Sequence, residues 1–200
     1  MLICYNAAAF AEWEKPKVEF SNSYRYLFRE RHSIYIQRGE FKFSYDRGTD
    51  NFAKIKLSPF IELRNNLQKD KLEYKEIGFE FGTDIFPWFY AGESFQYSRY
   101  NYDWVNWLWH PRIKYAAEAE TRLKFMLPVY QLSEERKIIA YVLNEFTYSF
   151  KLAEGTRNEV VLGITIPVTK YTEIGFDWRH IDRIHDFDSD ALEANVSLIF

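Results

Sequence analysis

The last nine residues of the chain, 192–200, alternate between apolar and polar side chains. The residues of one parity are all apolar: Leu192, Ala194, Val196, Leu198 and Phe200. Those of the other parity, apart from Ile199, are polar: Glu193, Asn195 and Ser197. Successive side chains of a β-strand point to opposite faces, so this period predicts a strand with one apolar face that ends on an aromatic residue. An α-helix would mix both classes on every face.

The same alternation recurs along the chain, in segments separated by charged or turn-forming residues. There are ten such segments: residues 16–28, 33–45, 52–64, 71–82, 87–99, 107–128, 137–150, 157–167, 171–181 and 190–200. The clearest is 107–128, whose apolar parity runs from Ile113 to Leu127. Its length leaves an alternative in which residues 116–120 form a helix or a turn.

Two segments contain irregularities. In 33–45, Ile34 and Ile36 have one parity while the aromatic residues that follow have the other. This change predicts a glycine bulge near Arg38 and Gly39, which would absorb one residue. Pro59 in the third segment is unusual for an inner strand, because proline cannot donate a hydrogen bond to a neighbouring strand.

Ten consecutive strands predict an all-β fold, namely an antiparallel up-and-down transmembrane β-barrel of about 10 strands, with 8 or 12 as alternatives. An even number places both chain ends on the same side of the membrane. The turn at 167–170 then lies on the periplasmic side. The charged connections lie on the exterior side: 29–32, 65–70, 100–106, 151–156 and 182–189.

A soluble β-barrel or sandwich would show the same period, so the choice depends on which face is apolar. Aromatic residues make up 20% of the chain, more volume than the interior of a small barrel holds. The apolar faces are therefore predicted to face lipid and the polar faces to line the lumen. The mean hydropathy of −0.41 is compatible with this arrangement, because half of each strand is polar.

This architecture predicts a location in the bacterial outer membrane. The expected partners are outer-membrane lipid and the barrel-assembly machinery, with Val196, Leu198 and Phe200 as the assembly signal. A net charge of −3 without a basic stripe argues against nucleic acid as a partner. The sequence leaves the oligomeric state open.

The first residues, 1–11, form a short apolar stretch that ends in an A-x-A-like pattern at Ala9 and Ala11. We interpret it as the remnant of a secretory signal peptide without its positively charged start, with the barrel comprising 12–200. The alternative is an apolar segment that stays attached. Cys4 is the only cysteine, so neither an intramolecular disulfide nor a thiolate metal cluster can form.

The C-terminal third, residues 136–200, carries a recognisable layout. Its elements are Asn144-Glu145-Phe146, Arg157-Asn158, Gly163, a closing hairpin with Gly175, and the terminal Phe200. This layout resembles the domain-of-unknown-function 2490 family of predicted outer-membrane barrels. The family usually has a second arginine shortly after the asparagine, where this chain has Glu159 or Val160. The resemblance implies fold and location only, because the family has no agreed activity.

Charged residues of both signs occupy the polar faces and are the main candidate site. The predicted lumen charges are Arg112, Lys114, Glu118, Glu120, Arg122, Lys124, Glu145, Arg157, Asp177, Arg179 and Glu193. They could line a selective pore or form a salt-bridged plug. A barrel of about eight strands has room only for side chains, so ten strands with long charged residues inside favour the plug. The function predicted is a non-enzymatic barrel with a structural, interaction or narrow-pore role.

The alternative function is a lipid-modifying enzyme with an active site at the rim, for which His110 and His185 are candidates. The chain has neither a Gly-x-Ser-x-Gly nor a His-x-Ser motif, so no catalytic residue is assigned. Asp186, Asp188 and Asp190 alternate as calcium ligands do, but the glycine and distal glutamate of an EF-hand are missing. A solvated loop is expected there, and no cofactor is predicted.

Overall fold

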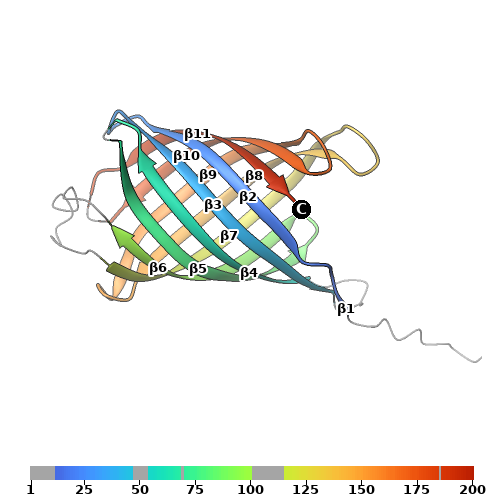
Figure 1. Cartoon of the computed structure of the whole chain (residues 1–200), viewed down its shortest axis with the longest axis horizontal. Helices are drawn as coiled ribbons and strands as arrows, with labels where there is room; N and C mark the ends of the chain where they lie inside the picture. Colours follow the sequence, from blue (N-terminus) through green and yellow to red (C-terminus); the bar gives the residue numbers. More distant parts are fainter. Residues whose placement is uncertain (1–11, 47–53, 69, 101–114, 185) are drawn as a thin grey trace, which may run out of the picture.

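The computed structural model describes residues 12–46, 54–68, 70–100, 115–184 and 186–200, and its strands wind around a closed barrel (Figure 1). The strands are β1 (Glu12–Trp13), β2 (Lys17–Leu27), β3 (His32–Asp46), β4 (Ile55–Asn66), β5 (Lys71–Phe86), β6 (Phe89–Tyr100), β7 (Tyr115–Gln131), β8 (Lys137–Ser149), β9 (Glu154–Pro167), β10 (Thr172–Arg183) and β11 (Ser189–Ile199). Among the described residues, no helix is long and apolar enough to cross a membrane.

The barrel has ten strands, because β2 to β11 each pair with the next and β11 pairs with β2. The short β1 pairs with β3 beyond the start of β2, so it prolongs β2 rather than adding a strand to the wall. Closure is continuous to the end of the chain, since Val18 and Phe200 exchange two backbone hydrogen bonds of 3.0 and 2.9 Å. The predicted antiparallel barrel of ten strands is confirmed.

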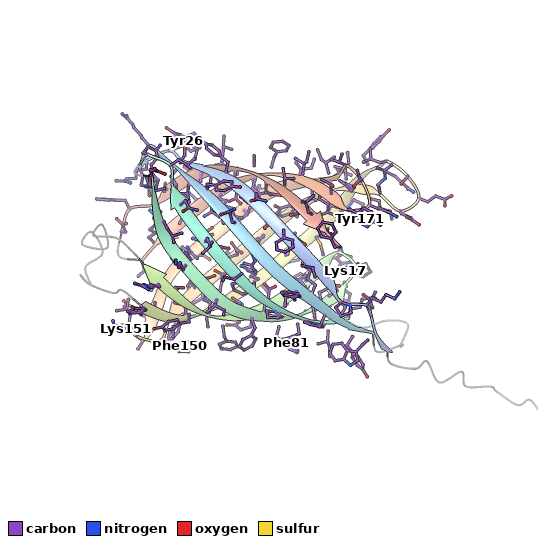
Figure 2. All side chains as sticks on the ribbon, in the orientation of Figure 1. Lys17, Tyr26, Phe81, Phe150, Lys151 and Tyr171 are labelled. Atoms are coloured by element: carbon purple, nitrogen blue, oxygen red, sulfur yellow. The ribbon has the colours of Figure 1, made fainter. Side chains whose placement is uncertain are left out.

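Successive side chains of each strand point alternately to the outside and to the lumen of the barrel. On β11, Leu192, Val196 and Phe200 point outward and are 52, 43 and 65% exposed, whereas Glu193 and Ser197 point inward and are 8% exposed. The other strands follow the same rule, so side chains project from both faces of the wall (Figure 2). The apolar faces are therefore on the outside of the barrel, as predicted.

The start of β2 and the end of β11 lie at the same end of the barrel. The turn between β9 and β10 is next to the C-terminal strand, because Ile199 N donates to the carbonyl oxygen of Tyr171 at 2.8 Å. Lys17 and Tyr171 lie at this end of the barrel, and Tyr26, Phe150 and Lys151 at the opposite one (Figure 2). We call these the terminal end and the distal end.

The predicted glycine bulge in the second segment is wrong. The pairing of β3 with β2 keeps one register from His32 to Lys42, through Arg38 and Gly39. Ile34 and Ile36 therefore face the lumen, where Ile36 is 6% exposed. The apparent change of parity arises because the lumen is apolar at its distal end, where Ile34 packs against a small cluster of Leu27, Ile181 and Ala191.

The helix-or-turn alternative for residues 116–120 is also wrong. They lie in β7 and are paired on both sides, for example Ala119 with Phe95 of β6 and Tyr148 of β8. Pro59 does occupy an inner strand, β4. The ladder between β3 and β4 passes from Glu40↔Phe60 directly to Phe43↔Leu57, so it is interrupted at the proline, which has no N–H to donate.

Candidate functional site: the charged lumen

The inward faces of the strands bring most of the predicted lumen charges together inside the barrel. Arg112 and Lys114 lie outside the described residues. The others face the interior: Glu118, Glu120, Arg122, Lys124, Glu145, Arg157, Asp177, Arg179 and Glu193. These residues come from five consecutive strands, β7 to β11, and pairing between the strands makes them neighbours.

Arg179 of β10 is one centre of the ion pairs. Its Nη1 lies 3.1 Å from Glu145 Oε2 and 3.0 Å from Glu159 Oε2, and its Nε lies 3.1 Å from Glu193 Oε2. Glu193 in turn accepts a 2.6 Å hydrogen bond from Arg25 Nε of β2. The planar guanidinium suits this arrangement, because its charge is spread over three nitrogens, and Nη1 donates to both Glu145 and Glu159.

Arg122 of β7 is the second centre. It contacts Glu120 at 2.6 Å and Glu145 at 2.9 Å, and it also forms an ion pair with Glu80 of β5. Glu145 therefore joins the two centres, with one oxygen toward Arg122 and the other toward Arg179.

The ion pairs continue along the remaining wall. Arg38 of β3 lies 3.9 Å from Glu80 and 3.5 Å from Glu62, and Glu62 accepts a 2.5 Å hydrogen bond from Arg64 of β4. Arg157 of β9 adds contacts of 3.3 Å to Glu120 and 3.1 Å to Glu159. We call this continuous set the lumen network. It draws on every strand of the wall except β6, whose inward Ser94, Gln96 and Ser98 are buried.

Several members of the lumen network were missing from the sequence-based set: Arg25, Arg38, Glu62, Arg64, Glu80 and Glu159. Their alternation with apolar residues was a sufficient signal for most of them. Arg38 was hidden by the supposed bulge. Glu159 lies where the chain departs from the family pattern, and its side chain is among the most buried of the network.

Two tyrosines fill inward space that glycines leave open. The Tyr90 hydroxyl donates to Glu80, and its ring lies where side chains at Gly82 and Gly92 would be. Tyr141 donates to Asp177, beside Gly163. Glycine is required at these positions by the close approach of an aromatic ring rather than by backbone conformation.

The composition of the lumen changes toward the terminal end. Lysines replace arginines there: Lys42 contacts Glu19 and Lys56 contacts Asp84, and both lysines are 38% exposed. Lys124 lies deeper, with Nζ 4.0 Å from the centroid of the Tyr141 ring. The terminal end of the lumen is thus more open to solvent than the arginine-rich middle.

The distal rim is held by a separate contact. Arg183 Nη1 donates to Glu30 Oε1 at 2.8 Å, and the Ser189 hydroxyl donates to Glu30 Oε2 at 2.5 Å. Burial alone would raise the pKa of Glu30, but the Ser189 hydrogen bond and the Arg183 charge outweigh it and hold the pKa below its usual 4.5. Glu30 is therefore a carboxylate that ties the β2–β3 turn to β10 and β11.

The candidate catalytic residues, His110 and His185, lie outside the described residues. His180 is described and lies 3.1 Å from Asp190 through Nδ1 and Oδ1. Asp186 instead accepts from the backbone N of Phe187. Within the described part of the chain, no group of three or more histidine, cysteine, aspartate or glutamate residues could hold a metal ion.

The outer wall decides what kind of barrel this is. Large apolar side chains are exposed on all sides of it, among them Phe41 (β3), Ile77 (β5), Phe125 (β7) and Phe176 (β10). Such a surface is stable only in contact with lipid, and the interior is charged rather than apolar. The protein is an outer-membrane β-barrel. The predicted location in the bacterial outer membrane is confirmed.

Three solved structures are similar to this chain at low sequence identity. The porin NanC is 8% identical, with 90% of this chain and 98% of that chain covered and a TM-score of 0.49. The β-domain of the Bordetella autotransporter BrkA is 10% identical, with 92% and 98% covered and a TM-score of 0.43. OmpT, an outer membrane protein of Vibrio cholerae, is 6% identical, with 95% and 99% covered and a TM-score of 0.37.

These similarities concern the fold alone. No protein-family model and no curated protein matches the chain. The resemblance to the domain-of-unknown-function 2490 family therefore stays a prediction.

Proposed function

We propose that this protein is a closed, non-enzymatic outer-membrane barrel whose lumen network acts as a plug, so that it serves the envelope as a structural or interaction element. The observation that supports this proposal is the continuity of the lumen network. Its ion pairs begin at Arg25 of β2, pass through β11 and the strands beyond it, and end at Arg64 of β4. None of the charged side chains in the network is more than 25% exposed.

The energetics of buried charges support closure. Removing one partner of a buried ion pair costs about 3–5 kcal/mol, because it leaves a charge without compensation. A solute crossing the lumen would have to separate several such pairs at once. The width of the barrel adds to this barrier, since ten strands give little more room than the eight that side chains alone can fill.

Conductance of the full chain in planar lipid bilayers tests the proposal. We expect no discrete current steps from the parent protein. The matched variant replaces Arg122, Glu145, Arg179 and Glu193 with serine, which removes two cations and two anions and leaves the net charge unchanged. This variant is expected to conduct. Ion-sized steps from the parent protein would contradict the plug and favour the narrow pore.

Folding of the variant must be established separately. A folded barrel in detergent migrates faster in electrophoresis before heating than after it, and this shift is the control. If the variant folds and stays silent, the four side chains are not what closes the barrel.

A further inference from the structure

Two cations stand side by side on the outer wall. Lys75 of β5 and Arg99 of β6 are directly opposite each other in the antiparallel pairing, and both are exposed. They share the outward face with Ile77 and Tyr97, the next residues of that parity. Like charges directly opposite on a sheet destabilise each other, so this pair calls for an anion.

The described residues supply no such anion. Neither Lys75 nor Arg99 forms an ion pair with a carboxylate among the residues that the structure describes. The same cross-strand row continues to Leu63 on one side and Tyr115 on the other. The contact found for Arg99 is aromatic, with Cζ 5.7 Å from the Tyr115 ring centroid.

An apolar groove begins immediately below the two cations, toward the terminal end. It has a volume of about 680 Å³, and its outward lining includes Phe20, Gly39, Ile61, Ile77, Phe79 and Tyr97. Gly39 lies in this groove beside Phe20 and Ile61, both of which would touch a Cβ added at that position. Its volume is in the range of small-molecule sites, ~300–1,000 Å³.

The position of Lys75 and Arg99 along the barrel predicts which membrane leaflet they contact. Lys75 is close to the distal start of β5 and Arg99 is next to the distal end of β6. In an even-stranded barrel with both termini on the periplasmic side, the distal end faces the exterior. The cations therefore lie at headgroup level of the outer leaflet, and the groove lies at the level of its acyl chains.

We propose that Lys75, Arg99 and the groove form a binding site for a phosphorylated lipid of the outer leaflet. Its phosphate lies between the two cations, where a guanidinium can donate two parallel hydrogen bonds and the ammonium adds a point charge. An acyl chain lies in the groove along Ile77 and Tyr97. The phosphate relieves the repulsion between the two cations, and the acyl chain covers the apolar groove.

Native mass spectrometry of the full chain in mild detergent tests this site, with purified bisphosphorylated lipid A as the probe. The parent protein is expected to retain one lipid A. The variant Lys75→Gln/Arg99→Gln is expected to bind about tenfold more weakly or worse, because two charge-assisted contacts are lost. Gly39→Leu fills the groove and is expected to weaken binding about threefold.

The matched control is Lys137→Gln/Lys170→Gln, which removes two exposed cations at the terminal end and is expected to bind lipid A as the parent does. All variants are checked for heat-modifiable migration. Dephosphorylated lipid A and inorganic phosphate distinguish the sources of affinity, and both are expected to bind far more weakly than lipid A. Equal retention by Lys75→Gln/Arg99→Gln, equal binding of dephosphorylated lipid A, or a lipid-free dimer in place of the complex would overturn the proposal.

Discussion

Tyr141 and Gly163 fit together inside the barrel, the tyrosine ring occupying the space that a side chain at Gly163 would need. The residues face each other across the β8–β9 pairing, and the Tyr141 hydroxyl continues to Asp177 of β10. A tyrosine, a glycine and a carboxylate from three strands thus form one unit. The interior of this barrel is ordered by such interlocking as well as by ion pairs.

Gly163→Ala is predicted to destabilise the barrel by about 1–3 kcal/mol, because the added methyl group would overlap both Tyr141 and Asp177. Gly39→Ala is the matched control. Its Cβ would lie at ordinary contact distances, 3.5 Å from Phe20 and 3.7 Å from Ile61. The free energy of unfolding from urea titration in lipid vesicles measures both. Equal stability of the two variants would contradict the interlocking.

Arg179→Met is predicted to cost about 3 kcal/mol of unfolding free energy, the lower end for a broken buried ion pair. The lower end applies because Glu145, Glu159 and Glu193 each keep another arginine. Arg179→Lys keeps the charge but loses the planar fork, so an intermediate loss is expected. Lys137→Met, at an exposed position, should change stability by less than about 0.5 kcal/mol. If Arg179→Met loses no more unfolding free energy than Lys137→Met, the lumen network does not stabilise the barrel.

Deletion of Phe200 is predicted to lower the amount of barrel assembled in the membrane severalfold. The deletion removes both backbone hydrogen bonds with Val18 and an outward aromatic side chain at the end of the closing strand. Phe176→Ala is the control, because it removes an equally outward aromatic residue from the middle of β10. Heat-modifiable protein in membrane fractions measures assembly. Normal insertion of the truncated chain would count against a role of Phe200 in assembly.

Acid is predicted to weaken the distal rim through Glu30. Its pKa is lower in the folded protein than the usual 4.5, so the ionised form stabilises the fold. This contribution is complete above about pH 4.5 and is lost as the pH falls through the lower folded pKa. Because Glu30 is partly exposed, the effect is about 1 kcal/mol at most. The stability difference between the parent and Glu30→Gln should therefore be present at pH 7 and absent once the pH is below the folded pKa of Glu30. A difference independent of pH would show that the Glu30 charge is not involved.

Most of the fold could be predicted from the sequence, because a period of two depends only on the alternation of a single strand. The closing segment, 190–200, corresponds to β11 (Ser189–Ile199), and the segment at 137–150 to β8 (Lys137–Ser149). Large aromatic residues on the apolar parity placed that parity outside. The tight turn before Tyr171 predicts that this end of the barrel faces the periplasm, and this orientation stays a prediction.

The lumen network could be predicted only as a set of inward charges. Alternation places Arg122, Glu145 and Arg179 on polar faces, but it does not say that Glu145 joins the two arginines.

Ion-pair partners depend on the register between strands, and alternation within a strand carries no information about register. Ile34 makes the same point, since the register of β3 with β2 places it inward, where it packs against an apolar cluster from other strands. The sequence by itself determined the strands, their apolar face and the membrane. The tertiary structure alone decided which charges meet, because closure of the barrel brings together residues that are far apart in the chain.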